Sequence, residues 1–279
     1  MHSIKSVLDE AAATLAPVSD SAMLDAEILL CQALDKPRSY LRAWPGKQLL
    51  PKQLAIFKAL LEQRQQGKPI AYITGQREFW SRDFQVSPDV LIPRPDTELL
   101  IELSLALIPA EQPCTLLDLG TGSGIIAITL AAERPQAQVS AIDFSLAALD
   151  IAKLNADRHK LSNIEFYRSD WFASVPATKF DLIISNPPYI AEDDAHLQQG
   201  DVRFEPRTAL SAPEQGLADI RMIATAARDY LNPGGHLLIE HGYNQQQPVQ
   251  ALFKDLHYAK VQTYSDLSGQ PRATYGQWP

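Results

Sequence analysis

Residues 115–127 read TLLDLGTGSGIIA, and this stretch decides the fold. Its first five residues are mostly apolar and predict a buried strand. Glycines then alternate at positions 120, 122 and 124, and an apolar helix follows directly. Glycine lets the backbone turn sharply and approach a ligand, while the first N–H groups of a helix bind anions. The stretch therefore predicts a strand–loop–helix unit of an α/β sheet, with a nucleoside ligand whose amino-acid end lies against the loop.

The chain after Pro113 continues this alternation of strand and helix patterns. Strands are predicted at 115–119, 138–143, 164–168, 180–185 and 236–240, and helices near 123–133, 146–160, 217–231 and 245–256. Such alternation indicates a mostly parallel, Rossmann-like sheet with helices on both faces. Residues 258–264 and 272–278 have no helix between them and predict an antiparallel hairpin at the end of the sheet.

A separate helical region is predicted before the sheet. Apolar residues recur at helical spacing over 4–15, and further helices are predicted at about 19–34 and 52–66. We therefore expect three parts: a small helical domain (1–74), a β-hairpin connector (75–95) and the α/β domain (96–279).

Local details are also predicted in these parts. The connector turn is expected at 81–83, and Asp96 or Thr97 is expected to cap a helix running to about Ile108. Lys52, Lys58, Arg64 and Lys68 of the helical domain are interpreted as a solvated face, with a docking patch as the alternative.

Composition narrows the class of protein. With 279 residues and 46% hydrophobic content, the chain can bury a large core. A net charge of −8 argues against direct nucleic-acid binding, which needs clustered Lys and Arg. Cys31 and Cys114 have no metal-ligand spacing, so no metal site is predicted. Acids near the N-terminus and the lack of a long uncharged run predict a cytoplasmic protein that does not bind membranes, and we expect a monomer.

Polar side chains follow the second and third predicted strands. Asp143 ends the second strand, where an acid binds a ribose diol in such folds, although it could instead cap the next helix. Asp170 ends the third strand and its carboxylate can accept from an adenine amino group. Trp171 can pack on the base, unless it is an ordinary core aromatic. S-adenosyl-L-methionine fits this set, with its carboxylate against the loop formed by Gly120, Thr121, Gly122, Ser123 and Gly124.

The tetrapeptide Asn186-Pro187-Pro188-Tyr189 follows the fourth strand, beside the expected methyl group. Proline has no N–H, so the turn presents acceptors. If the Asn186 oxygen and the Pro187 carbonyl each accept an N–H, a planar NH2 group is aimed at the methyl while Tyr189 stacks on it. We therefore predict methyl transfer that leaves S-adenosylhomocysteine, with Asn186, Pro187 and Tyr189 as catalytic residues and Asn186 to Tyr189 as the substrate clamp. The alternative for the four residues alone is a tight turn with a packing tyrosine.

The chain resembles the peptide chain release factor glutamine methyltransferases, class I enzymes with a helical N-terminal domain. The resemblance rests on Ile92–Glu98, Asp118–Gly124, Asp143, Asn186–Tyr189, Phe204–Pro206 with Ala209 and Leu210, Glu240–Gly242, and Asp266 with Gly269 and Arg272. It implies methylation of the glutamine in the Gly-Gly-Gln loop of bacterial release factors, the protein partners in translation termination. It also implies cofactor contacts at Gly120 to Gly124, Asp143, Trp171 and Asn186.

Other hypotheses stay open. The tetrapeptide also occurs in adenine methyltransferases, so a DNA or RNA adenine amino-group methyltransferase is the second hypothesis. A ribosome-associated nucleoside-binding module without catalysis is the third. Arg94 could position a ligand or stiffen the domain junction. Glu240 and His241 are not assigned to catalysis, because histidine more often satisfies local hydrogen bonds and the mechanism needs no base.

Overall fold

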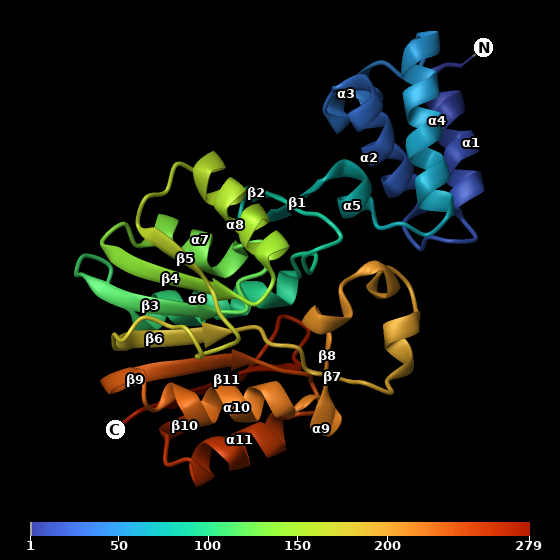
Figure 1. The fold of residues 1–279 in the computed structure, drawn as a ribbon. Helices are drawn as coiled ribbons and strands as arrows, with labels where there is room; N and C mark the ends of the chain where they lie inside the picture. Colours follow the sequence, from blue (N-terminus) through green and yellow to red (C-terminus); the bar gives the residue numbers. More distant parts are fainter. Residues whose placement is uncertain (1) are drawn as a thin grey trace. The chain divides into compact units, whose positions relative to one another are not determined.

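The computed structural model describes residues 2–279 (Figure 1). The chain divides into two compact units. The N-terminal unit extends to Gln76 and also includes Gln199–Phe204, whereas the second unit consists of Arg77–Gln198 and Glu205–Pro279. The segment Gln199–Phe204 thus belongs to the N-terminal unit although it interrupts the second unit in sequence.

Helices form most of the N-terminal unit. They are α1 (Ile4–Leu15), α2 (Ala22–Leu34), α3 (Arg38–Ala43), α4 (Pro51–Gln65) and α5 (Ile70–Thr74). The apolar faces of α1, α2 and α4 pack around Leu29 and Phe57. The sequence predicted these three helices. It did not predict α3 and α5, which are too short to show a helical period.

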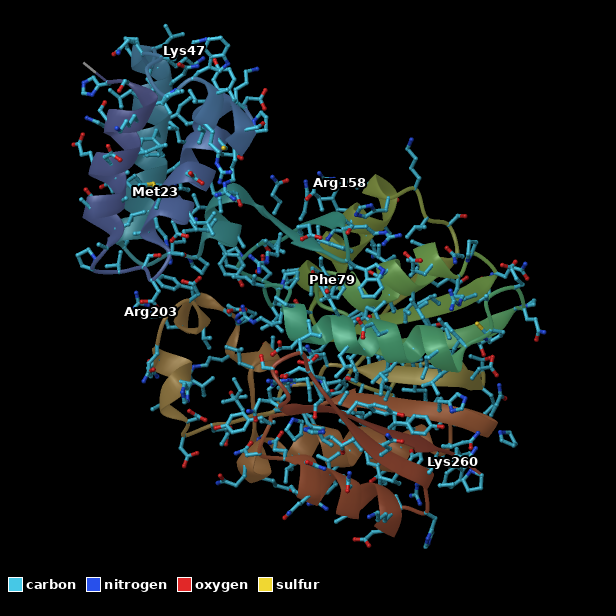
Figure 2. The ribbon with its side chains drawn as sticks, turned by 180° about the vertical axis from the view of Figure 1, so that it is seen from behind. Met23, Lys47, Phe79, Arg158, Arg203 and Lys260 are labelled. Atoms are coloured by element: carbon cyan, nitrogen blue, oxygen red, sulfur yellow. The ribbon has the colours of Figure 1, made fainter. Side chains whose placement is uncertain are left out.

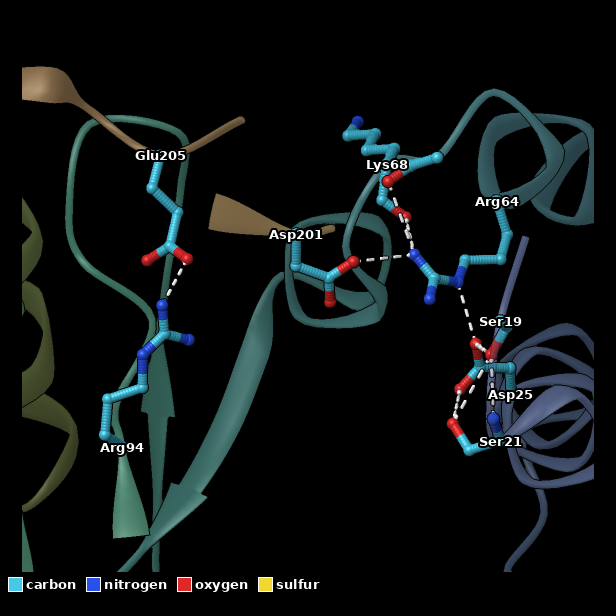
Figure 3. A network of polar contacts seen from close by, with 9 residues as sticks. Ser19, Ser21, Asp25, Arg64, Lys68, Arg94, Asp201 and Glu205 are labelled. Atoms are coloured by element: carbon cyan, nitrogen blue, oxygen red, sulfur yellow. Dashed lines mark hydrogen bonds and ion pairs between the residues drawn. The ribbon is translucent and has the colours of Figure 1, made fainter. Parts of the chain in front are cut away.

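A polar network crosses the same unit (Figure 3). Arg64 is 7% exposed; its Nε lies 2.7 Å from Oδ2 of buried Asp25, and its Nη1 lies 2.9 Å from Oδ1 of Asp201. The hydroxyls of Ser19 and Ser21 also donate to Asp25. The interpretation of Arg64 as part of a solvated face was therefore wrong. This arginine is buried and holds the segment Gln199–Phe204 to the helices.

A hairpin of β1 (Gln76–Phe79) and β2 (Arg82–Gln85) comes next. Its turn residues Trp80 and Ser81 both have positive φ, as a two-residue type I′ turn requires. The predicted turn at 81–83 was therefore misplaced by one residue. Phe79, labelled in Figure 2, is buried against the edge of Phe84, with 6.2 Å between the ring centroids, and both rings join the core of the second unit.

A seven-stranded sheet forms the centre of the second unit, in the order β10-β11-β9-β6-β3-β4-β5. Its strands are β3 (Cys114–Leu119), β4 (Ala137–Asp143), β5 (Ile164–Arg168), β6 (Phe180–Ser185), β9 (Leu231–Glu240), β10 (Ala259–Ser265) and β11 (Pro271–Gln277). Strands β9, β6, β3, β4 and β5 pair in parallel, whereas β11 is antiparallel to both of its neighbours. The predicted α/β sheet with a C-terminal antiparallel hairpin is confirmed.

Helices cover both faces of this sheet (Figure 1). One face carries α6 (Glu98–Leu107), α7 (Ile125–Glu133) and α8 (Leu146–Arg158), and the other carries α10 (Ala218–Ala227) and α11 (Gln246–Asp255). The remaining short elements are β7 (Ile190–Ala191), β8 (Ser211–Ala212), α9 (Pro213–Gly216) and the 3-10 turns Pro95–Thr97, Ala195–Gln198, Val202–Phe204 and Arg207–Ala209. Within residues 2–279 there is no helix with the length and apolar character needed to cross a bilayer.

The pairing of β3 with β6 sets the position of the loops that follow them. Leu119 lies opposite Ser185 in this parallel pair, and the Ser185 hydroxyl donates to the Leu119 carbonyl at 2.7 Å. Strands β4 and β5 extend the sheet on one side of β3, and β6 and β9 on the other, so the chain order reverses between β3 and β6. Open α/β sheets bind ligands at such a reversal, beyond the carboxyl ends of the strands.

Asp118 holds the loop after β3 in place through hydrogen bonds. It is fully buried, and its Oδ2 accepts from the Thr121 hydroxyl at 2.7 Å and from the Ala127 backbone N–H at 3.2 Å. Burial raises the pKa of Asp118 to about 7, against the opposing effect of these two hydrogen bonds. The carboxyl group therefore titrates near neutral pH in the folded protein.

The replacement Asp118→Asn should change how stability depends on pH. Below pH 4 both folded and unfolded chains hold the Asp118 proton, so its contribution is complete there. As pH rises toward about 7 the unfolded chain has lost the proton that the folded chain keeps, so the contribution is lost progressively. Relative to the variant, the wild-type free energy of unfolding should fall by about 1 kcal/mol between about pH 6 and 8, measured by urea unfolding. Parallel curves for the two proteins would contradict the raised pKa.

Candidate active site

A cavity of about 390 Å³ lies at the carboxyl edge of the sheet, within the second unit. Among the predicted site residues, its lining includes Gly120, Thr121, Gly122, Ser123, Asp143, Asp170, Trp171, Asn186 and Pro188. Gly124, Pro187 and Tyr189 do not belong to the lining. The structure thus brings together groups that follow four different strands.

Gly124 does not line the cavity but packs against the helices behind the loop. It has φ +85°, and a Cβ at this position would lie 2.7 Å from Cδ1 of Ile128 and 3.2 Å from Cβ of Ala152. Only glycine allows both this backbone conformation and the close contact between α7 and α8. The loop residues before it are therefore held at the cavity by the packing of the helices behind them.

Asp143 joins the glycine loop to the end of β4. Its Oδ2 accepts from the Gly122 N–H at 2.9 Å, and its Oδ1 accepts from the Ser145 N–H at 2.9 Å. Burial raises the pKa of Asp143, and these N–H groups act against the increase. The cap of α8 is Ser145, whose hydroxyl accepts from the Ala148 N–H. Asp143 is thus not the side chain that caps this helix, and it also lines the cavity.

Trp171 lines the cavity beside the glycine loop. Its ring carbon Cζ3 lies 3.5 Å from the place where a Cβ on Gly120 would be. The indole also hydrogen-bonds Asp219, and this bond partly offsets the burial that raises the Asp219 pKa. Asp219 belongs to the first turn of α10 and lines the cavity as well. Asp219 was not predicted from the sequence, because no local motif distinguishes it from other helical acids.

The Asn186 amide contacts the start of α6. Its Nδ2 donates to Oγ1 of Thr97 at 3.2 Å, and Thr97 is fully buried. Asp96 or Thr97 was predicted to cap α6, and this prediction was wrong. Thr97 occupies the N-cap position, but its side chain makes no capping bond. Asp96 instead forms an ion pair with Arg272 at 3.2 Å. An amide has its nitrogen on one side and its oxygen on the other, so this contact turns the Asn186 oxygen away from Thr97.

The Tyr189 side chain contacts the buried carboxyl group of Glu240. Its hydroxyl donates to Oε1 of Glu240 at 3.1 Å, and burial raises the Tyr189 pKa. Glu240 is 1% exposed, and burial raises its pKa to about 7, while the Thr97 and Tyr189 hydroxyls and the Arg272 charge lower it. Tyr189 therefore contacts this buried carboxyl group directly, whereas Asn186 contacts Thr97, whose hydroxyl lowers the Glu240 pKa. The ring nitrogens of His241 hydrogen-bond the Gly242 carbonyl and the Thr274 hydroxyl.

The Tyr189 backbone is held as firmly as its side chain. Nε2 of Gln245 donates to the Tyr189 carbonyl at 2.9 Å, while its Oε1 accepts from the Gly242 N–H at 2.8 Å. Gly216 packs against the same carbonyl: a Cβ there would lie 2.0 Å from the Tyr189 oxygen. The position of the tetrapeptide is thus determined by residues about 30 and 60 positions later in the chain.

An ion pair between Arg94 and Glu205 holds two segments that border the cavity (Figure 3). Arg94, which lines the cavity, binds Glu205, whose side chain has no exposed surface. Glu205 also accepts from the Ile92 N–H at 3.0 Å. Pro206, Thr208 and Ala209 continue the lining directly after this glutamate. Arg94 therefore faces the cavity and holds the loop that borders it.

Comparisons with known proteins agree with this geometry. Residues 96–202 match the Methyltransferase small domain family and residues 6–75 match the PrmC N-terminal domain family. The T. thermophilus 16S rRNA N2 G1207 methyltransferase, solved with AdoMet and guanosine, superposes with a TM-score of 0.54 at 19% identity. The match covers 73% of this chain and 50% of that one. This likeness shows the fold of class I methyltransferases.

Sequence relatives are much closer. The release factor glutamine methyltransferase of Shewanella oneidensis is 49% identical, over 99% of this chain and 96% of that protein. The protein of the same name from Vibrio cholerae is 52% identical, over 93% of this chain and 91% of that protein. With identity at this level over nearly the whole length, the chain belongs to the release factor glutamine methyltransferase family.

Proposed function

We propose that this protein transfers a methyl group from S-adenosylmethionine to the side-chain nitrogen of the glutamine in the Gly-Gly-Gln loop of bacterial peptide chain release factors. The observation that carries the proposal is the Asn186 amide, which lines the same cavity as the glycine loop. The names of the relatives support the substrate class.

The residues around the cavity fit the cofactor. A volume of about 390 Å³ lies in the range of small-molecule pockets. The loop Gly120–Ser123 suits the amino-acid end, Asp143 the ribose hydroxyls, and Asp170 with Trp171 the adenine. When bound, S-adenosylmethionine supplies an electrophilic methyl group.

The chain's own residues orient the acceptor nitrogen. An amide nitrogen is a poor nucleophile because its lone pair is delocalised into the carbonyl. The Asn186 oxygen and the Pro187 carbonyl would each accept one N–H and so hold the nitrogen in line with the methyl, with the developing positive charge facing two dipoles. After the transfer the strongly acidic N-methylated amide would lose one N–H proton to water. Pro188 lines the cavity and borders the acceptor. Stacking of Tyr189 on the acceptor stays a prediction. In this structure the Tyr189 hydroxyl donates to Glu240 and its ring packs with the core.

The remaining parts of the proposal concern the partner. We assign recognition of the release factor to the helical domain (1–74), with 75–95 as its connector to the methyltransferase domain (96–279). The match of residues 6–75 to a domain found in this family supports this assignment. We also propose a cytoplasmic monomer without direct nucleic-acid contacts, which suits a net charge of −8.

Methyl transfer to a release factor tests the proposed function directly. Labelled methyl from S-adenosylmethionine should enter a purified bacterial release factor and should not enter the same factor with its loop glutamine replaced by alanine. DNA and RNA serve as competing acceptors in parallel reactions. Equal labelling of both release factors, or labelling of adenine alone, would contradict the proposal.

Removing the amide should separate turnover from cofactor binding. The variant Asn186→Ala loses one dipole facing the reacting nitrogen, so kcat should fall by about 10²- to 10³-fold. The Kd for S-adenosylmethionine, measured by calorimetry, should change much less because other residues form most of the cofactor lining. An unchanged kcat would refute the orienting role of Asn186.

Gly216→Ala should displace the tetrapeptide without altering any of its four residues. The new Cβ would meet the Tyr189 carbonyl at 2.0 Å, so the backbone must shift. We expect turnover to fall at least about tenfold, as small misplacements of reacting groups reduce rates strongly. Gly234→Ala is the matched control: it has the same φ of +81°, and its nearest neighbour is 4.0 Å away. Equal losses of turnover in both variants would show that backbone strain, and not displacement, is responsible.

A further inference from the structure

We propose that Thr97 is a positioning residue, which fixes the Asn186 amide with its nitrogen turned into the protein and its oxygen toward the acceptor. The inference rests on the proposed function, in which that oxygen accepts an N–H from the substrate. The residue lies 89 positions from Asn186 in the sequence and contacts it directly, Oγ1 to Nδ2, at 3.2 Å.

The backbone presents the Thr97 hydroxyl to Asn186. Thr97 ends the 3-10 turn Pro95–Thr97 and precedes α6, so its position is set by a proline-stiffened segment and a packed helix. The side chain is fully buried and makes no capping bond to the helix. Its hydroxyl is therefore available for the tetrapeptide, unlike that of an ordinary N-cap threonine.

The atoms of this hydrogen bond determine its direction. Nδ2 of Asn186 carries two protons and does not accept, so Oγ1 of Thr97 is the acceptor. The Thr97 hydroxyl also lowers the Glu240 pKa, in agreement with a hydroxyl proton that faces the carboxyl group. The Thr97 oxygen thereby selects the NH2 end of the amide.

The opposite amide orientation is disfavoured by the same groups. It would set the Asn186 oxygen against the Thr97 oxygen unless the hydroxyl turned its proton away from Glu240, whose Oε2 has no hydrogen-bond partner among the described residues. Leaving buried polar groups unpaired costs more than a hydrogen bond gains. Thr97 thus favours the orientation in which Asn186 presents its oxygen, and not N–H groups, to a substrate NH2.

Isosteric replacement of Thr97 provides the test. Thr97→Val keeps the shape but removes the acceptor, so kcat for release factor methylation should fall about tenfold, the factor that matches loss of one typical hydrogen bond. The KM for the release factor and the Kd for S-adenosylmethionine should stay within about twofold. Thr97→Ser restores the hydroxyl and should restore kcat. The matched control is Thr129→Val in α7, because Thr129 is equally buried and its hydroxyl has no partner among the described residues.

A double-variant comparison separates positioning from general packing. In the Asn186→Ala background, adding Thr97→Val should reduce single-turnover rates no further, because the group that Thr97 orients is gone. Melting temperatures show whether the variants are folded, and Thr97→Ala replaces Thr97→Val if the valine unfolds the protein.

Three results would overturn the inference: full kcat in Thr97→Val, no recovery in Thr97→Ser, or the same fold-loss from Thr97→Val with and without Asn186. A wild-type protein that methylates adenine but no release factor would refute the proposed function alone. The Thr97 variants would then be measured on adenine, where the same predictions apply because the clamp also receives an NH2 group.

Discussion

The parallel register between β3 and β6 is the constraint on which the site depends. Leu119 lies opposite Ser185. The Ser185 hydroxyl also donates a hydrogen bond to the Leu119 carbonyl, at the carboxyl end of the two strands. The glycine loop and Asn186 therefore leave the sheet at the same level, on neighbouring strands. A slip of one residue would move Asn186 by about 3.3 Å and turn its side chain to the other face. In the proposed function, backbone pairing would thus align methyl donor and acceptor before any side chain does.

Buried carboxyl groups secure the loops that this register brings together. Asp118 holds the glycine loop, Glu205 holds the segment at Ile92 and Arg94, and Glu240 holds Tyr189. Their burial is costly for the ionised form, which is why the pKa values of Asp118 and Glu240 rise to about 7. Asp118, Glu205 and Glu240 thus accept hydrogen bonds that hold the structure around the site.

The sequence predicted the sheet well because its strands are short apolar runs followed by glycines, acids or the tetrapeptide. Turn chemistry and helix starts were predicted less well: the hairpin turn lies at Trp80 and Ser81, and Thr97 does not cap α6. Individual side-chain contacts between residues far apart in the sequence were not predicted. The bonds of Thr97 to Asn186 and of Arg64 to Asp201 join residues whose local sequence carries no sign of the partner. Asp143 ends its strand as predicted and lines the cavity, whereas Gly124, predicted to contact the cofactor, lies outside the lining and packs between helices.

The short segment Gln199–Phe204 has a consequence for how this protein is built. Because it docks on the N-terminal helices through Asp201 and is flanked on both sides by the second unit, the N-terminal unit is discontinuous in sequence. Exchange of this unit between proteins by a single crossover near position 76 would separate Arg64 from one of its two carboxylate partners. A chimaera that keeps both carboxylate partners of Arg64 must therefore carry both pieces.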